Sequence, residues 1–342
     1  MLELKDSSLR EELPRDITNQ LFDGAMRGQV TLPLVSVVIT NFNYKEYVVQ
    51  AIKSVASQTY PFIECIIVDD CSTDGSYSEI ELQLVKLGKK SFRAIKLETN
   101  SGQLAAMKAG LELASGVFIN FLDSDDLLLP NFVDANVRLH LNPFYPAAVS
   151  ASDMMQIDGK GQLLAGTYVS HFKERGTEDV PGVKKLLANG VSCFDARVAI
   201  GPPRSEGEYY IERAYSGWPV VACSSLLFRR SVLEMIMPTS TEEWRICSDY
   251  LLYKLAHAIG GTLVMPSAYS FYRRHESNNH SSDPVYGAYV APDAVSTVAL
   301  DIKISQYIEQ NAALFSSFLP ESFVEELKSR DIDRWVSVLF GE

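Results

Sequence analysis

The feature that most limits the fold of this chain is an alternation of short apolar runs with amphipathic segments between residues 33 and 144. The runs are rich in Val, Ile and Phe and have the length of single buried strands. The segments between them place apolar residues on one face of a helix. We expect strands at 35–40, 63–68, 92–97 and 117–122, and helices at 44–58, 74–87 and 103–114. This alternation predicts an α/β fold with a mainly parallel sheet, helices on its faces and right-handed crossovers.

The remaining residues are expected to form three further parts. A polar extension covers residues 1–32. A second half, residues 145–284, contains more Gly, Pro and aromatic residues, and its clearest helical segment is 242–259. Residues 285–342 carry helical patterns at 295–318 and 321–339 and are expected to form a C-terminal appendage.

Charge, cysteine spacing and missing motifs argue against several classes of protein. A net charge of −12 disfavours attraction to nucleic acid or anionic lipid. Five widely spaced cysteines without a CxxC pair argue against a disulfide framework or a zinc site. No GxGxxG follows the first strand and no P-loop motif occurs. The sequence therefore lacks the main motif of a dinucleotide-dependent dehydrogenase and that of a P-loop NTPase. The polar start and the lack of an apolar run near the roughly 20 residues of a membrane span predict a cytoplasmic protein without a transmembrane segment.

Polar residues follow three of the four expected strands. Ligands of open parallel sheets bind at the carboxyl ends of the strands, which meet at one edge. The residues at these ends are Thr40, Asn41, Phe42 and Asn43, then Asp69 and Asp70, and finally Asp123, Ser124, Asp125 and Asp126. Turn formation or helix capping explains Ser72, Thr73 and Asp74 as well as ligand binding does.

Capping does not easily explain Asp123 and Asp125. Residues two apart on an extended segment project to the same side, so these like charges repel. A divalent cation relieves that repulsion. Few carboxylates without other strong ligands suit Mg²⁺ or Mn²⁺, which keep waters and share oxygens with a diphosphate. The residues therefore predict a divalent metal and an anionic phosphate ligand.

The stretch 34–141 closely resembles the nucleotide-binding half of family 2 glycosyltransferases. Five motifs occur in the family's order: VSVVITNFN at 35–43, SVASQTY at 54–60, IIVDDCSTDG at 66–75, NSG at 100–102 and FLDSDD at 121–126. The resemblance implies a GT-A fold with a nucleotide-sugar-binding half at 33–144 and an acceptor half carrying the catalytic base at 145–284. It also implies inverting transfer of a sugar from a nucleoside-diphosphate sugar, with Mn²⁺ or Mg²⁺ as cofactor.

The resemblance assigns nucleotide-sugar contacts to the first, third and fourth motifs. Thr40 and Phe42, flanked by Asn41 and Asn43, would line the base pocket. Asp70 would bond the edge of a uridine or thymidine base, while Asp69 is the more structural of the two. Asn100 and Gly102 look like the family's NxG element, for which a tight turn into the next helix is an equally good explanation.

The fifth motif, Asp123-Ser124-Asp125, resembles the family's DxD motif. Its last acid would bind the metal, and its first would face ribose or the metal. Asp126 either supports this pair or caps the segment that follows.

The family's second landmark is an acid pair that opens a helix in the acceptor half. The sequence ICSDYLLYKL at 246–255 resembles it and makes Asp249 the candidate catalytic base. Ser248 stands where the first acid often stands, which departs from the pattern. The competing explanation is that Asp249 caps the helix.

Further candidates come from the rest of the acceptor half. The stretch YRRHESNN at 272–279 resembles the family's late basic loop, so His275 is a candidate metal or phosphate contact, against the alternative of a surface residue. The remaining candidates for the acceptor or donor-sugar surface are Trp218, Ser224, Trp244, Ser248, Arg273 and Arg274. For the aromatic residues, a place in the core is the commoner role.

Three alternatives remain. A sugar-nucleotide nucleotidyltransferase would show a Gly- and Lys-rich loop after Ile39, and a phosphoacceptor receiver domain would carry its acids after the first strand. A nucleotide-sugar-binding protein with weak turnover is the third, and slow donor hydrolysis would distinguish it from an enzyme. The acceptor is a glycan, a lipid-linked or another hydroxyl compound; association of copies and peripheral membrane contact through the acceptor are left open.

Overall fold

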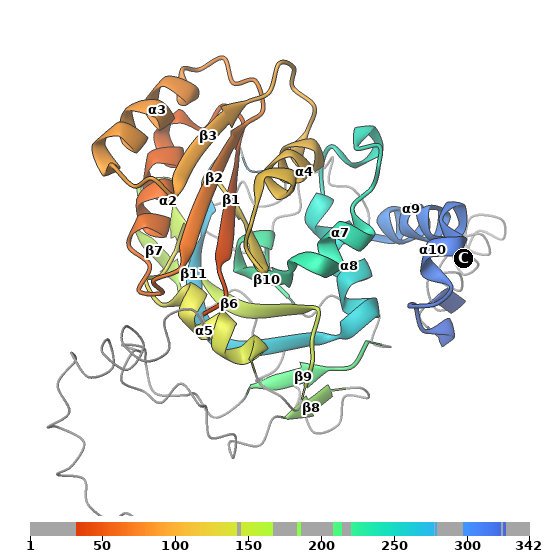
Figure 1. The fold of residues 1–342 in the computed structure, drawn as a ribbon. Helices are drawn as coiled ribbons and strands as arrows, with labels where there is room; N and C mark the ends of the chain where they lie inside the picture. The colour runs from red at the N-terminus through yellow and green to blue at the C-terminus, as the bar shows by residue number, and fades with distance from the viewer. Residues whose placement is uncertain are drawn as a thin grey trace, which may run out of the picture.

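The computed structural model describes residues 32–141, 145–166, 183–185, 208–213, 220–276, 278, 297–322 and 324–325. One mixed sheet runs through these residues, with helices on both of its faces (Figure 1). Its strand order is β3-β2-β1-β4-β10-β6-β11-β9-β8, with β5 and β7 added beside β11 and β6.

The first half is the predicted parallel sheet. Each strand and helix lies within two residues of its expected bounds. The elements are β1 (Val35–Asn41), α2 (Lys45–Ala56), β2 (Ile63–Asp69), α3 (Ser76–Leu87), β3 (Phe92–Lys96), α4 (Gln103–Leu113) and β4 (Phe118–Asp123). Strands β1, β2, β3 and β4 all pair in parallel.

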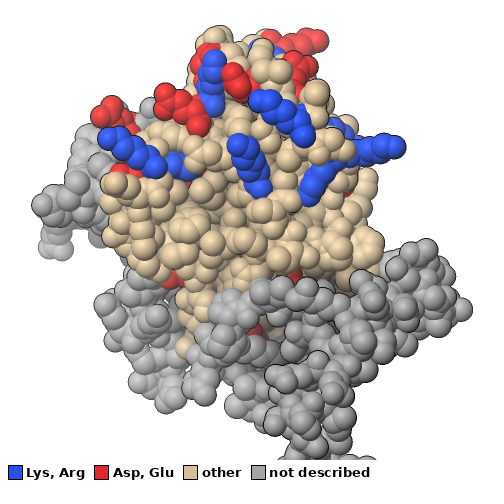
Figure 2. Space-filling model, turned by 90° about the vertical axis from the view of Figure 1, so that its left-hand side faces the viewer, with Lys and Arg blue, Asp and Glu red and all other residues tan. Residues whose placement is uncertain are grey.

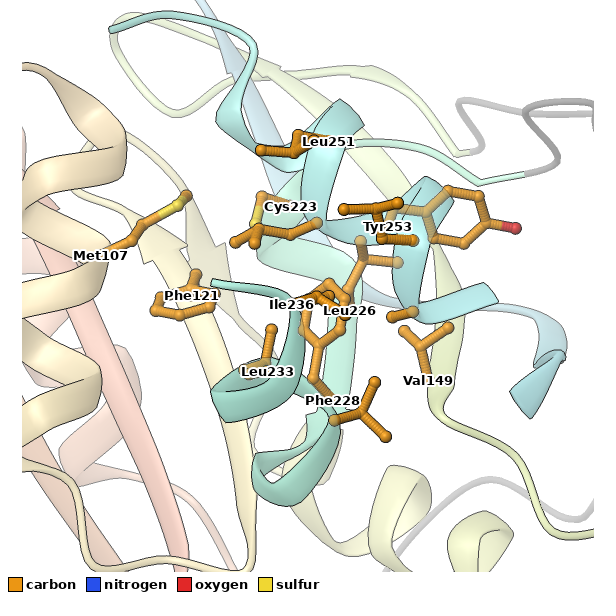
Figure 3. Close-up of a cluster of buried hydrophobic side chains, with 14 of the residues drawn as sticks. Met107, Phe121, Val149, Cys223, Leu226, Phe228, Leu233, Ile236, Leu251 and Tyr253 are labelled. Carbon is orange, nitrogen blue, oxygen red and sulfur yellow. The ribbon is translucent and has the colours of Figure 1, made fainter. Parts of the chain in front are cut away.

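Alternate residues of each strand point to opposite faces of the sheet, and both faces are buried. Along β1, Val37 and Ile39 join the core beneath α2, while Val38 between them joins the core beneath α4. Because both faces are covered, the strands read as continuous apolar runs. Figure 3 shows the second of these cores, where side chains from α4, β4, β10 and the helices α7 and α8 meet.

Within the described residues, two long strands and five short ones complete the sheet. Two of them, β6 (Val149–Asp158) and β11 (Thr262–Arg274), pair in parallel with a register shift near Met265. The others pair antiparallel, so the sheet is mixed beyond β4. They are β5 (Leu127–Leu128), β7 (Leu163–Ala165), β8 (Val183–Lys185), β9 (Tyr209–Ile211) and β10 (Leu226–Arg229). The sheet is shared by both expected halves, and the boundary at residue 144 stays a prediction, as does the extension 1–32.

Short helices connect and cover these strands. They are α5 (Phe132–His140), the 3-10 turn η4 (Cys223–Ser225), α7 (Arg230–Ile236), the 3-10 turn η5 (Glu242–Trp244) and α8 (Ser248–Gly260). The single helix expected at 242–259 is therefore divided. Cys247 has a φ of 56°, in the left-handed region, which ends the first turn and lets α8 start in a new direction.

The C-terminal appendage begins with α9 (Thr297–Gln310) and α10 (Ala312–Phe315). Helix α9 packs beside α8 (Figure 1), and its residues Leu300, Ile304 and Ile308 belong to the same core as α8. The expected helix at 295–318 is thus divided at Asn311. The helix expected at 321–339 lies mostly outside the described residues.

Among the described helices, none combines the length and the apolar character needed to cross a bilayer. Figure 2 looks onto the side that carries α2 and α3. There, Lys and Arg form a band with Asp and Glu beside and above it. Lys45 of α2 pairs with Glu79 of α3 at 3.7 Å. This side is therefore mixed in sign.

Candidate functional site

The carboxyl ends of β1, β2 and β4 bring the predicted polar residues to one edge of the sheet. Parallel pairing sets Thr40 beside Asp123 and Asn41 beside Asp69. The Thr40 hydroxyl lies 3.4 Å from Asp123 Oδ1. Residues that are far apart in the chain thus share one rim, as the strand pattern predicts.

Asp69 holds the turn that follows β2. Its Oδ1 accepts a bond from Ser72 N at 2.8 Å, and its Oδ2 accepts one from Asn41 Nδ2 at 2.7 Å. The side chain is completely buried. Asn43, with a φ of 58°, accepts a bond from Thr73 N at 2.8 Å and ties the ends of β1 and β2 together. Asp69 and Asn43 therefore stabilise the ends of β1 and β2, in addition to any contact with a ligand.

Asp70 fixes the loop before α4. Its two oxygens accept bonds from Ser101 N and Gly102 N, both at 2.8 Å. Gly102 has a φ of 92°, and a Cβ there would lie 2.7 Å from Cα of Arg245. The approach of Arg245 therefore requires glycine at 102. The assignment of Asp70 to a base and of Asn100 to the ligand stays a prediction.

Phe42 is an exposed residue at the outer side of the rim. Its ring is 42% exposed, whereas the strand residues before it are buried. An exposed ring beside the buried turn of Asp69 and Asp70 offers a flat apolar surface on which a base can stack.

Three acids of one turn crowd together after β4. Burial raises the pKa of Asp123 to about 7, with further contributions from Asp125 and Asp249. Burial and the charges of Asp125 and Asp123 also raise the pKa of Asp126. Asp123 Oδ1 accepts a bond of 2.9 Å from Gln103 Nε2. Such crowding favours protonation or a bound cation.

Strand β11 carries His275 to this turn. Strand β5, directly after the turn, pairs with β11, and Asp126 Oδ1 accepts a bond of 2.9 Å from Arg273 N. His275 Nε2 then lies 3.0 Å from Asp125 Oδ2, and Asn278 Nδ2 lies 3.4 Å from the same oxygen. The two predicted metal contacts Asp125 and His275 are therefore neighbours.

Arg273 and Arg274 are buried and do not lie on an open surface. Arg273 is 1% exposed and donates from Nε to the Asp125 carbonyl at 2.7 Å and from Nη2 to Gln50 at 3.0 Å. Its guanidinium lies 4.7 Å from the centre of the Tyr47 ring. Arg274 donates from Nε to Gln156 at 2.6 Å. Arg273 therefore supports the acid turn from behind, whereas this bond of Arg274 goes to β6.

The donor set fits a hard divalent cation that also binds phosphate. In the part of the chain that the structure describes, no three His, Cys, Asp or Glu side chains form a complete metal site. Mg²⁺ and Mn²⁺ are commonly held by one or two carboxylates, with water and substrate phosphate completing the shell. Asp125 and His275, whose Oδ2 and Nε2 atoms lie 3.0 Å apart, would fit such an incomplete set.

Helix α8 brings Asp249 to the acids from the other half. Asp249 lies half-buried in its first turn, and its charge contributes to the raised pKa of Asp123. Ser248 is fully buried and donates from its hydroxyl to the Trp244 carbonyl at 2.9 Å. A serine therefore closes the turn that precedes the candidate base.

The remaining weak candidates lie inside the protein or outside the described residues. Trp244 is 2% exposed and packs against Lys303, whose Nζ is 4.4 Å from the ring centre. Ser224 is fully buried, and its hydroxyl accepts a bond of 3.1 Å from Asp123 N. Trp218 lies outside the described residues. The core explanation thus fits Trp244, and Ser224 supports the acid turn.

Comparison with known proteins finds a family match over part of the chain. A family model described as "Glycosyl transferase family 2" matches residues 36–175, the stretch that contains the sheet rim and the acid turn. Over these residues the chain matches glycosyl transferase family 2.

Proteins named as glycosyltransferases match different lengths of the chain. An uncharacterized glycosyltransferase of Nostoc is 28% identical over 72% of this chain and 67% of its own length. The putative teichuronic acid biosynthesis glycosyltransferase TuaG of Bacillus subtilis is 44% identical over 28% of this chain and 36% of its own length. The chain is accordingly a glycosyltransferase.

Solved structures share its GT-A fold. The crystal structure of S. aureus TarS 1–349 in complex with UDP has a TM-score of 0.54 and 20% identity, and covers 89% of this chain and 72% of that one. Mannosyltransferase PcManGT from Pyrobaculum calidifontis, in complex with GDP-Man and Mn²⁺, has a TM-score of 0.51 and 15% identity, with 87% and 69% covered.

Sequence reasoning missed four residues around the site of this glycosyltransferase. Gln103 contacts Asp123, and Asn278 contacts Asp125. Tyr44 has a raised pKa because of burial and the charges of the acid turn. Arg245 bonds Asn100. Only Asn278 lay within a stretch singled out beforehand, because the others act through contacts between distant segments.

Proposed function

We propose that this glycosyltransferase moves a sugar from a uridine or thymidine diphosphate sugar to an acceptor hydroxyl, with inversion at the anomeric carbon. One observation carries the proposal. Gln103 bonds the Asp123 carboxylate of the acid turn at 2.9 Å, and its backbone N–H also bonds the carbonyl of Arg245, four residues before Asp249, at 3.0 Å. A donor phosphate site and a base for the acceptor would then face each other at one rim.

Donor binding is supported by the rim residues and by the structural neighbours. TarS was crystallised with UDP and with UDP-GlcNAc, and PcManGT with GDP-Man and Mn²⁺. In this chain, Phe42 would stack on the base, and Asp70 would accept a hydrogen bond from its edge. The loop at Asn100 and Gly102 would lie beside the nucleotide.

The chemical step is a displacement. The acceptor oxygen forms a bond to the anomeric carbon while the bond from that carbon to the phosphate oxygen breaks. Asp249 accepts the hydroxyl proton, and the nucleoside diphosphate leaves with the electron pair. Attack occurs on the face opposite the leaving group, which inverts the configuration. General-base assistance contributes about 10²- to 10⁴-fold to such reactions.

Asp125, with Asp123 and His275, would hold the divalent cation. When bound, Mg²⁺ or Mn²⁺ neutralises charge that develops on the leaving diphosphate. Neighbouring residues of the chain orient these side chains. Arg273 fixes the Asp125 carbonyl from behind, and Gln103 orients the Asp123 carboxylate.

The relatives indicate only the chemical class of the acceptor. TuaG is named for teichuronic acid biosynthesis, which favours a glycan or lipid-linked acceptor for this chain too. Such an acceptor would bring a cytoplasmic enzyme to the membrane surface. Association of copies through α9 and α10 is compatible with this function.

Replacing Asp125 with Ala tests the donor site. We expect the variant to bind nucleoside diphosphate in Mn²⁺ only as weakly as the unchanged protein does in EDTA, because the carboxylate that holds the ion is gone. Isothermal titration measures both affinities. Glu234→Gln removes an exposed acid of α7, remote from the rim, and serves as the control that retains binding. Undiminished metal-dependent binding by Asp125→Ala would remove this residue from the donor site.

A further inference from the structure

Arg245 joins the second half of the protein to the loop before α4. Its carbonyl accepts a bond of 3.0 Å from Gln103 N. Its guanidinium donates to the Asn100 carbonyl at 3.2 Å and also to the Asn100 side-chain oxygen. The close contact of its Cα with Gly102 leaves no room for a side chain there. Backbone and side chain of one residue thus hold the whole loop 100–103.

The same loop is attached to both acids on the donor side. Asp70 accepts two backbone bonds from it, from Ser101 and Gly102. Gln103 bonds the Asp123 carboxylate at 2.9 Å. The position of the loop is therefore fixed relative to the predicted nucleotide and to the acid turn.

On its other side, Arg245 is linked to Asp249 through a short, constrained segment. Trp244 N bonds the Thr241 carbonyl at 3.0 Å, and Ser248 bonds the Trp244 carbonyl at 2.9 Å. Lys303 of α9 bonds the Glu243 carbonyl and covers the Trp244 ring. These contacts constrain the segment. A shift of Arg245 would therefore also shift the start of α8.

We propose that Arg245 is a positioning residue that sets the distance between Asp249 and the donor by clamping the start of α8 onto the loop 100–103. The inference rests on the function proposed above. Asp70 still holds the loop through Ser101 N and Gly102 N when the guanidinium is lost, so the loss displaces the base more than it displaces the nucleotide site. Small displacements of a catalytic group cost up to about 100-fold in rate.

The test uses the full chain with Arg245→Ala, Arg245→Lys, Asn100→Ala and the double variant Arg245→Ala with Asn100→Ala. We expect Arg245→Ala to lower kcat for transfer about 10- to 100-fold, with less than about a threefold change in the Kd of the nucleoside diphosphate. Arg245→Lys should recover part of kcat, since an ammonium group reaches one of the two acceptors on Asn100. The kcat of the double variant should fall no further than the kcat of the more impaired single variant, because both substitutions break the same contact.

Arg230→Ala is the matched control. Arg230 pairs with Glu234 at 2.7 Å on the surface of α7, so its loss should leave kcat and Kd unchanged. Unchanged kcat in Arg245→Ala would overturn the inference. So would a rise in Kd equal to the fall in kcat, which would make Arg245 a donor contact. Failure of the proposed function differs from both, because the unmodified protein would then neither bind nucleoside diphosphate nor transfer sugar.

Discussion

Replacing Asp249 with Asn should lower the rate of sugar transfer by about 10²- to 10⁴-fold and leave nucleoside diphosphate affinity nearly unchanged. The amide keeps the size of the side chain but accepts no proton from the attacking hydroxyl. Asp249 stands in the first turn of α8, across from the acid turn, where an acceptor rather than the nucleotide would lie. Steady-state transfer kinetics and isothermal titration on the same preparation separate the two effects.

Asp134→Asn is the matched control for this experiment. Asp134 pairs with Arg138 on α5, away from the rim, so the control should transfer sugar at the original rate. Transfer by Asp249→Asn at the rate of the control would exclude Asp249 as the base. The raised pKa of Asp123 would then make Asp123 the next residue to test.

Replacing Asp301 with Ala should destabilise the fold by about 3–5 kcal/mol, because it leaves a buried charge without its partner. Asp301 of α9 lies 3.8 Å from Lys254 Nζ, and both side chains are almost fully buried. Asp301 also accepts a bond of 2.8 Å from the Tyr250 hydroxyl. Denaturant unfolding followed by circular dichroism measures the loss. Because Lys254 and Tyr250 belong to α8, the loss would show that α9 stabilises the helix of the candidate base.

Two further variants give this prediction its controls. Glu309→Ala, an exposed position on the same helix, should change stability by less than about 0.5 kcal/mol. The double variant Lys254→Met with Asp301→Leu should recover most of the loss, since it removes both buried charges together. A change below about 1 kcal/mol in Asp301→Ala would mean that the buried pair contributes little beyond a surface ion pair.

The first half of the fold could be predicted because its signals are local. Strands such as β1 are buried on both faces, so their sequences are continuous apolar runs with helical patterns between them. The long strands β6 and β11 carry no such pattern. β6 buries Ser150, Ser152 and Asp153, and β11 contains Pro266 beside its register shift. Their stability depends on neighbours in the sheet, which a single sequence does not reveal.

The candidate site also has one part that the sequence predicts and another that it does not. The polar turns after β1, β2 and β4 follow directly from the ends of the strands, whereas contacts across the molecule do not. Arg245 and Asn100 are 145 residues apart, and Arg273 reaches the acid turn only because β11 pairs with β5. The sequence motif suggested exposed roles for Arg273 and Trp244. Their burial is a consequence of packing that a local pattern does not contain.

The central claim is that the rim binds a nucleoside diphosphate together with a divalent metal. The most direct measurement is isothermal titration of UDP, dTDP and GDP into the unmodified protein, each in Mn²⁺ and again in EDTA. We predict that UDP or dTDP binds in Mn²⁺ and that EDTA removes or strongly weakens this binding. Binding of none of the three, or equal binding with and without the metal, would contradict the account.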